Sequence, residues 1–319
     1  MRLADLKGRS VAVWGTDASA RAALRAIAAV HPSRLLAVDD RADYASSEWD
    51  SSLAPLAGGD HAFPALVTAE VVVGCVPGHP WLAEIRSRGI AVTSGSALWM
   101  ADHASRTVAV TGSPVAAALI AHLLAAFDRP VVTGTPLLSL PLPLPPGTDH
   151  VVLLSAAECA SLTSSPRVAV MTELSSADSP AVAAPSVSSA SSVLPEDQLN
   201  LVRHGPEMIV VNGADLPLRD AIRGITDINR FPPIPAGAED SRFRVEAQSV
   251  FCSDDALFPR VALRMPGEDA GRDLCVALAV LDGLGIDVVS ARTQLSEAVS
   301  AFEPTPPLDD DEKPPDPAD

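Results

Sequence analysis

Short apolar runs alternate with segments of helical spacing through the first hundred residues. The runs that predict strands are residues 10–14, 35–38, 70–76 and 90–93. Apolar positions with helical spacing cover residues 18–30 and 80–88, and Gly89 ends the second of these segments. Strands that alternate with helices favour a parallel sheet with helices on its faces, so we expect a Rossmann-like α/β layer here.

A second α/β unit begins near residue 107. A strand at 107–110 is followed by a turn at Gly112 and a helix at 115–127. Three more Val-rich runs are typical of buried parallel strands, and they cover residues 151–154, 167–171 and 208–211. Residues 243–251 predict a strand or one arm of a hairpin. Amphipathic helices are predicted at 274–284 and 291–302.

Three segments interrupt or end this pattern. Residues 136–146 read PLLSLPLPLPP and are excluded from a central strand, because proline cannot donate to the ladder. Residues 175–193 are rich in Ser, Ala and Pro and predict a loop or flexible linker. The expected organisation is therefore a Rossmann-like domain at 1–105, a second α/β domain at 106–303 and a disordered acidic, Pro-rich tail at 304–319.

Charge excludes several classes of function. The chain of 319 residues has 23 Lys plus Arg against 40 Asp plus Glu, a net charge of −17, and only two lysines, Lys7 and Lys313. A chain this acidic is a poor partner for nucleic acid, since such binding depends on clustered cations. Chemistry that needs a lysine inside the fold, such as phosphate binding or a carbamylated metal bridge, is excluded as well.

Cysteine spacing and hydropathy indicate the compartment. Four scattered cysteines form no C-x-x-C pair and lack zinc-ligand spacing with histidine, so we expect buried thiols and no metal. The N-terminus has no leader pattern, and the longest apolar run, 115–127, is too short to span a bilayer. We therefore expect a soluble, cytoplasmic protein without a membrane span.

The turn after the strand at 107–110 is the first candidate site. Thr111, Gly112 and Ser113 lie between a strand and a helix, the setting of a phosphate-binding loop, in which backbone N–H groups point at phosphate oxygens. Such a loop also needs a further glycine, a lysine and a hydroxyl for Mg²⁺, which are missing. An ordinary strand–turn–helix connection is the alternative.

Nine segments in order resemble one family. They are LKGRSVAVWG, VDDR, GCVPGHPWLAEIRSRGIAVTSGSALWMAD, RTVAVTGS, VVLLSAAECASL, SPRVAVMTELS, QLNLVRHGPEMIVVNGAD, LRMPGEDAGRDLCVALAVLDGLGID and AVSAFEP. Together they span residues 6 to about 303, and their order resembles that of the Mur ligases, closest to the branch that adds D-glutamate to UDP-N-acetylmuramoyl-L-alanine. The resemblance implies a Rossmann-like UDP-sugar domain and a central ATPase-type domain. It also implies that the family's C-terminal ligase domain has no counterpart in this sequence.

The same resemblance implies that ATP and Mg²⁺ are not bound. The family's loop glycine, lysine and hydroxyl correspond here to Val115, Ala116 and Ala117. Leu153 replaces the Mg²⁺-binding glutamate, Glu158 a glutamine, and Gln198 the carbamylated lysine. Asp269, Ala270 and Asp273 replace the His, Asn and Asn of the family's adenine-side pattern H-N-x-x-N. We therefore expect no catalytic residue, no metal ligand and no bound cofactor.

The N-terminal domain keeps part of a UDP-sugar site. Gly15, Asp39, Arg41 and Gly78 match positions of the family's first loop, its uracil-side D-x-R sequence and its Pro-Gly turn. Asp17 replaces a loop glycine and brings a carboxylate close to any diphosphate. A solvated turn at Asp39 and Arg41 is the alternative.

These observations favour a catalytically inactive Mur-ligase-like protein with a binding or regulatory role in peptidoglycan precursor synthesis. Its candidate partners are a UDP-N-acetylmuramoyl-type ligand and a protein such as an intact Mur ligase. Two alternatives remain open. One is the ATP-dependent glutamate ligase itself or a subunit of it, with the third domain supplied in trans, and the other is a UDP-sugar sensor.

Overall fold

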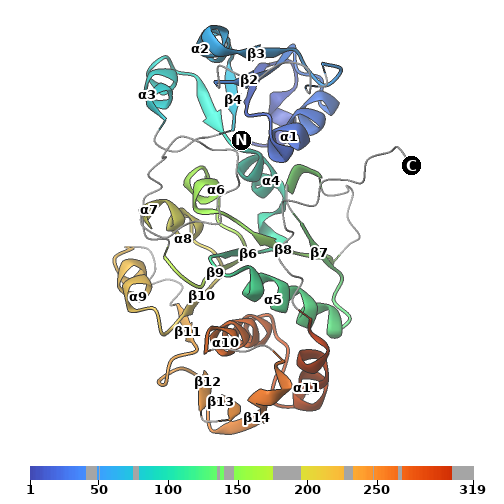
Figure 1. The fold of residues 1–319 in the computed structure, drawn as a ribbon, viewed down its shortest axis with the longest axis vertical. Helices are drawn as coiled ribbons and strands as arrows, with labels where there is room; N and C mark the ends of the chain where they lie inside the picture. The colour runs from blue at the N-terminus through green and yellow to red at the C-terminus, as the bar shows by residue number, and fades with distance from the viewer. Residues whose placement is uncertain are drawn as a thin grey trace, which may run out of the picture.

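The computed structural model describes residues 1–40, 49, 51–74, 79–134, 137–139, 147–174, 195–225, 233–246, 248–264 and 268–303. Within them the chain forms two parallel sheets and one small antiparallel sheet, stacked along the long axis of the molecule (Figure 1). The expected α/β architecture is therefore confirmed. The expected linker at 175–193 and the tail at 304–319 lie outside the described residues.

The N-terminal sheet has five parallel strands in the order β3-β2-β1-β4-β5. The strands are β1 (Ser10–Trp14), β2 (Arg34–Asp39), β3 (Leu56–Gly58), β4 (Val71–Val73) and β5 (Ala91–Thr93). Helix α1 (Ala18–Ala29) covers one face, and α2 (Ala62–Val67) and α3 (Pro80–Ser87) cover the other. Side chains alternate between the two faces, so that Val11 and Val13 face α1 while Ala12 and Trp14 face α2 and α3.

The central sheet has six parallel strands in the order β11-β10-β9-β6-β8-β7. The strands are β6 (Thr107–Thr111), β7 (Val131–Thr133), β8 (Asp149–Leu153), β9 (Val168–Met171), β10 (Met208–Asn212) and β11 (Ile234–Ala236). β6 lies in the middle, and the chain passes to β7 and β8 on one side before it crosses to β9 on the other. Ligands of open α/β sheets bind at such a switch point, at the carboxyl ends of the strands.

Helices cover both faces of the central sheet. α5 (Pro114–Ala126), α10 (Glu268–Gly283) and α11 (Arg292–Ala301) share one core with the antiparallel sheet. The second core is formed with α4 (Gly95–His103), α6 (Ala156–Ala160), α8 (Asn200–Arg203) and α9 (Leu216–Arg223). The short α7 (Pro195–Gln198) packs against α6. Figure 1 shows α10 next to α5, with α11 and the small sheet below them.

The structure corrects several expected elements. The segment 243–251 is a hairpin of β12 (Phe243–Glu246) and β13 (Ser249–Cys252), and β14 (Asp255–Pro259) adds a third strand. α10 begins six residues before the predicted helix at 274–284. Within the proline-rich segment 136–146, the described residues form η5 (Leu137–Ser139), a 3-10 turn and not a strand. Several described elements were not predicted, among them α4 and β7.

Candidate functional site

The nucleotide-loop candidate lies at the carboxyl end of β6, at the switch point of the central sheet. Gly112 has φ of +102°, and a Cβ at this position would collide with Thr172 Oγ1. Only glycine fits this turn, because both the backbone angle and the close approach of Thr172 exclude a side chain. The loop geometry that the sequence indicated is therefore present.

The loop's polar groups are bonded to one another. The backbone N–H of Ser113 donates to Thr172 Oγ1 over 2.7 Å, and that hydroxyl donates to the carbonyl of Thr111 over 3.2 Å. Gln198 Nε2 donates to Thr111 Oγ1 over 3.1 Å, and Asn212 Nδ2 donates to the carbonyl of Thr172. Thr111, Thr172 and Gln198 are all buried. A buried network whose members satisfy one another is rigid and leaves few groups for a ligand.

A carboxylate lies at the N-terminus of α5, where the resemblance would place a phosphate. Ser113 caps this helix by accepting from the N–H of Ala116, and its Oγ donates to Asp273 Oδ2 over 2.6 Å. Burial raises the pKa of Asp273 to about 6, the bond from Ser113 opposes this rise, and the charges of Asp269 and Glu173 add to it. A helix N-terminus favours an anion, and here a side chain of the protein supplies one.

Most of the positions that hold the nucleotide and metal in the family are occupied here by apolar side chains. Ala116 and Ala117, which stand where the family has its lysine and hydroxyl, are 0% and 9% exposed and belong to the core under α5. Leu153 packs against the same core. Gln198, in place of the carbamylated lysine, holds Thr111. The described residues therefore do not match the glycine, lysine and hydroxyl with which a phosphate loop holds ATP and Mg²⁺, and the carboxylate of Asp273 lies where a phosphate would bind.

Glu158 has a structural role here. It forms a capping box with Ser155 at the start of α6, and it accepts from Ser96 Oγ over 2.7 Å. Ser96 belongs to α4, so the side chain connects two helices. Among the described residues, no three His, Cys, Asp or Glu gather as a metal site.

The N-terminal candidates Gly15 and Asp39 lie side by side at the carboxyl ends of β1 and β2. The N–H of Gly15 donates to the carbonyl of Val38, and Thr16 Oγ1 donates to Asp39 Oδ2 over 2.7 Å. Asp39 is 2% exposed, so it is not part of a solvated turn. Arg41 and Gly78, the other two candidates, lie outside the described residues.

Asp17 is the N-cap of α1 and occupies the helix end beside Gly15. Its exposed carboxylate accepts from the N–H of Ala20 over 2.8 Å. A diphosphate approaching this helix end would meet a negative charge. The site therefore differs electrostatically from an open phosphate-binding turn.

His79 makes contacts that the sequence analysis did not predict. It caps α3, as its Nδ1 accepts from the N–H of Trp81, and its Nε2 lies 3.1 Å from Asp40 Oδ2. Its ring packs edge-on against Trp14 and Trp81. The sequence signal for the cap was the H-P-W order at a helix start, whereas the pairing with Asp40 joins residues 39 positions apart and has no local signal.

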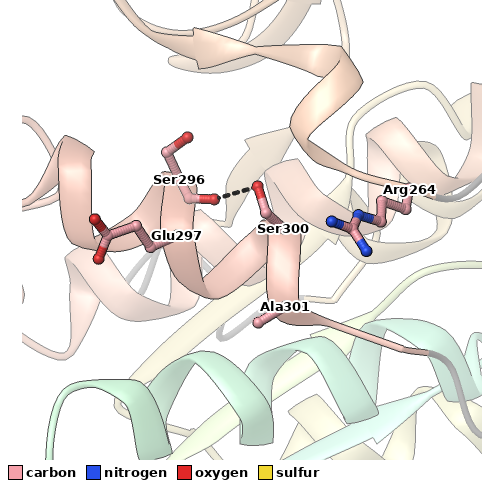
Figure 2. A pocket seen from close by; sticks show the side chains of 5 residues that line it. All are labelled: Arg264, Ser296, Glu297, Ser300 and Ala301. Carbon is pink, nitrogen blue, oxygen red and sulfur yellow. Dashed lines mark hydrogen bonds between the residues drawn. The ribbon is translucent and has the colours of Figure 1, made fainter.

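A shallow hollow of about 410 Å³ lies between α11 and the segment after β14 (Figure 2). Its five lining residues are Arg264, Ser296, Glu297, Ser300 and Ala301. Figure 2 shows Arg264 on one side of Ser300 and Glu297 on the other, pointing away. None of these residues belongs to the sets around Ser113 or Gly15, so the hollow is separate from both candidate sites.

Two further expectations concern the cysteines and a membrane span. Cys159, Cys252 and Cys275 are buried and unpaired, as predicted, and Cys75 lies outside the described residues. No helix in the described part of the chain has the length and apolar character needed to cross a bilayer.

The comparisons with known proteins agree with the resemblance. Over 95% of its length the chain is 45% identical to a Micromonospora sp. protein named UDP-N-acetylmuramoyl-L-alanine–L-glutamate ligase, and it covers 67% of that protein. A Salinispora tropica protein of the same name is 44% identical over 95% of the chain, with 68% of that protein covered. The sequence resemblance pointed to D-glutamate, whereas both relatives are named for L-glutamate.

Solved structures agree on the fold. The crystal structure of UDP-N-acetylmuramate:L-alanyl-γ-D-glutamyl-meso-diaminopimelate ligase from Neisseria meningitides superimposes with a TM-score of 0.54 at 17% identity, covering 94% of this chain and 99% of that one. No family model matches the chain. The length and level of identity to the two relatives nevertheless settle the assignment: this chain belongs to the Mur ligase family, in the branch of the UDP-N-acetylmuramoyl-L-alanine glutamate ligases.

Proposed function

We propose that this chain acts at the same stage of peptidoglycan precursor synthesis as its relatives, as a protein that binds a UDP-N-acetylmuramoyl-type ligand but does not turn over ATP. The observation that carries the proposal is the bond from Ser113 to Asp273 at the N-terminus of α5. A buried carboxylate there repels the phosphates of a nucleotide, and no lysine offsets it. The family's chemistry depends on stabilising charge on transferring phosphoryl groups, which this loop does not do.

The remaining ligand site is the carboxyl edge of the N-terminal sheet. Gly15 and Thr16 follow β1, which lies between β2 and β4 at the switch point of the sheet, and Asp39 ends the neighbouring β2. A buried carboxylate after the second strand is a common reader of ribose or base hydroxyl and N–H groups. This edge therefore supports binding of the uridine part, with Asp17 limiting the affinity for the diphosphate.

Calorimetric titration tests the proposal. UDP-N-acetylmuramoyl-L-alanine and ATP with Mg²⁺ are titrated separately into the full chain, and the Micromonospora relative serves as positive control for both ligands. We expect heat of binding for the first ligand and none for the second. Saturable binding of ATP with Mg²⁺ would contradict the proposal, and no binding of either ligand would leave only a role through protein partners.

Replacing Asp17 measures how the charge at the N-terminus of α1 affects the affinity for the UDP-linked ligand. Asp17→Asn keeps a capping side chain and removes the charge. Loss of a charge repulsion of about 1 kcal/mol predicts roughly fivefold tighter binding of UDP-N-acetylmuramoyl-L-alanine. Asp128→Asn, an equally exposed change after α5, is the matched control and leaves the affinity unchanged. Equal affinities of Asp17→Asn and the unmodified protein would show that the diphosphate does not bind at this helix.

Ligase activity is the second candidate function, and the 45% identity over 95% of the chain to a named ligase favours it. The test is ADP release in the presence of UDP-N-acetylmuramoyl-L-alanine and ATP, with L-glutamate and D-glutamate supplied separately. Release that requires both the UDP substrate and glutamate would establish the ligase and reject the first proposal. We expect none above the background of the chain without substrate.

A further inference from the structure

Helix α4 is buried around its circumference from Ser96 to Met100, whereas Asp102 near its end is exposed. Ala97, Leu98, Trp99 and Met100 are each at most 2% exposed. Leu98 belongs to the core of the N-terminal sheet, whereas the other three belong to the core of the central sheet. A helix that is apolar around its circumference packs within a core and does not lie on a surface. α4 is therefore shared by both halves of the chain.

Turn η5, which follows β7 of the central sheet, packs beside this helix. Leu137 is buried in the central core, and Leu138 packs against the cores of both sheets. η5 contacts α1 and α4. A Cβ added at Gly95 would lie 3.2 Å from Leu138 Cδ1 and 4.0 Å from the Cβ of Ala23, so α4, η5 and α1 meet at close-packed distance.

Two hydrogen bonds connect the start of α4 to α6. Ser94 and Ser161 share a hydrogen bond of 2.5 Å between their hydroxyls, and Ser96 Oγ donates to Glu158 Oε1 over 2.7 Å. Ser94 follows β5 of the N-terminal sheet directly, whereas α6 follows β8 of the central sheet. These bonds therefore fix the end of one sheet to a helix of the other.

We infer that α4 and η5 form a locked joint that makes the N-terminal and central sheets one rigid, cooperatively unfolding body. Adjoining units of a chain move against each other unless their interface is large and apolar. Here a rotation at α4 separates either Leu98 from the first core or Trp99 and Met100 from the second. The inference does not rest on the proposed ligand, since it concerns only how the two halves are held.

The test is the spread of distances between spin labels on the two halves. Nitroxides are attached to Arg25→Cys on α1 and Ala118→Cys on α5, both exposed, with Cys75 replaced by serine in every sample. Pulsed electron paramagnetic resonance on the full chain is expected to give one narrow distance distribution. The variant Ser96→Ala/Leu138→Ala is expected to lose that narrow distribution, because it removes one hydrogen bond and the apolar wedge.

Leu119→Ala is the matched control, because Leu119 is fully buried in the core under α5, to which no residue of α4 or η5 belongs. It lowers the melting temperature and keeps the narrow distribution. A broad or two-peaked distribution in the unmodified protein would overturn the inference, as would an unchanged width in the double variant. Should the double variant not fold, calorimetry of the unmodified chain decides: one transition with equal calorimetric and van't Hoff enthalpies supports the joint, and two separate transitions reject it.

Discussion

At the scale of single residues, two buried titratable groups give the stability opposite dependences on pH. Asp273 has a pKa raised to about 6 by burial, and His150 has a pKa lowered to about 4, chiefly by burial and then by the charges of His103 and Arg106. Both ring nitrogens of His150 are buried without a hydrogen-bond partner. Each group must therefore be tested by its own substitution, because the two effects partly cancel in the unmodified protein.

Asp273→Asn is expected to raise the free energy of unfolding at pH 7.5 by about 1–2 kcal/mol, after allowance for partial solvent screening. The folded chain binds the Asp273 proton more tightly than the unfolded chain, so this group's contribution grows as pH falls from above 6 to below 4 and is lost as pH rises. Asparagine still accepts from Ser113 and does not titrate. Urea unfolding at pH 5 and 7.5 measures the change, with Asp128→Asn as control; an unchanged pH dependence in Asp273→Asn would contradict it.

In acid, the free energy of unfolding of His150→Phe is expected to fall less than that of the unmodified protein. The unfolded chain binds the imidazole proton more tightly than the folded chain, so the loss begins as pH falls below about 6.5 and is complete below about 4. Phenylalanine keeps the edge contact with Trp99 and has no nitrogen to leave unpaired. Urea unfolding at pH 7 and 4.5 gives a smaller difference for the variant. An equal difference would mean that His150 is not the group responsible.

At the scale of elements, the turn from β6 to α5 depends on one hydroxyl. Ser113→Ala removes the N-cap of α5 and the donor to Asp273, which predicts a loss of about 1–2 kcal/mol in unfolding free energy. Ser113→Thr retains a capping hydroxyl and serves as control. Thermal or urea unfolding measures both variants. A loss in Ser113→Ala no larger than that in Ser113→Thr would show that the hydroxyl of Ser113 does not supply this stabilisation.

The elements also show what the sequence could predict. β1, β6 and β10 were recognisable as continuous apolar runs, and α3 from its proline start and glycine stop. α4 was missed because its buried apolar run, residues 97–100, is too continuous to show an amphipathic period. β7 was missed because a three-residue edge strand is defined by its neighbour β8 more than by its own residues.

The sequence predicted which groups the candidate site lacks, but it did not predict which residues of the site contact one another. The missing lysine could be read directly from the sequence, and so could Ala116 and Ala117. The bond from Ser113 to Asp273 joins residues 160 positions apart, and the pairing of Gln198 with Thr111 spans 87. No local pattern reports such pairs, because only the packing of α10 and α7 against the loop brings them together.

At the scale of the whole molecule, the net charge of −17 places like charges over the surface. Their mutual repulsion destabilises the compact state and is screened by salt within a Debye length of about 8 Å at physiological ionic strength. The melting temperature is therefore expected to rise as NaCl is added from low to physiological ionic strength. Calorimetry measures the shift, KCl controls for the identity of the cation, and a falling melting temperature would mean that surface ion pairs outweigh the repulsion.

The shared helix α4 also sets the order of events during synthesis. The core of the N-terminal sheet includes Leu98 and is packed by Leu138, which is translated long after the last strand of that sheet ends at Thr93. A nascent chain that stops before η5 therefore exposes an incomplete apolar surface, even though all five strands have left the ribosome. The first half of this protein therefore completes its core only after the second half has been made as far as η5.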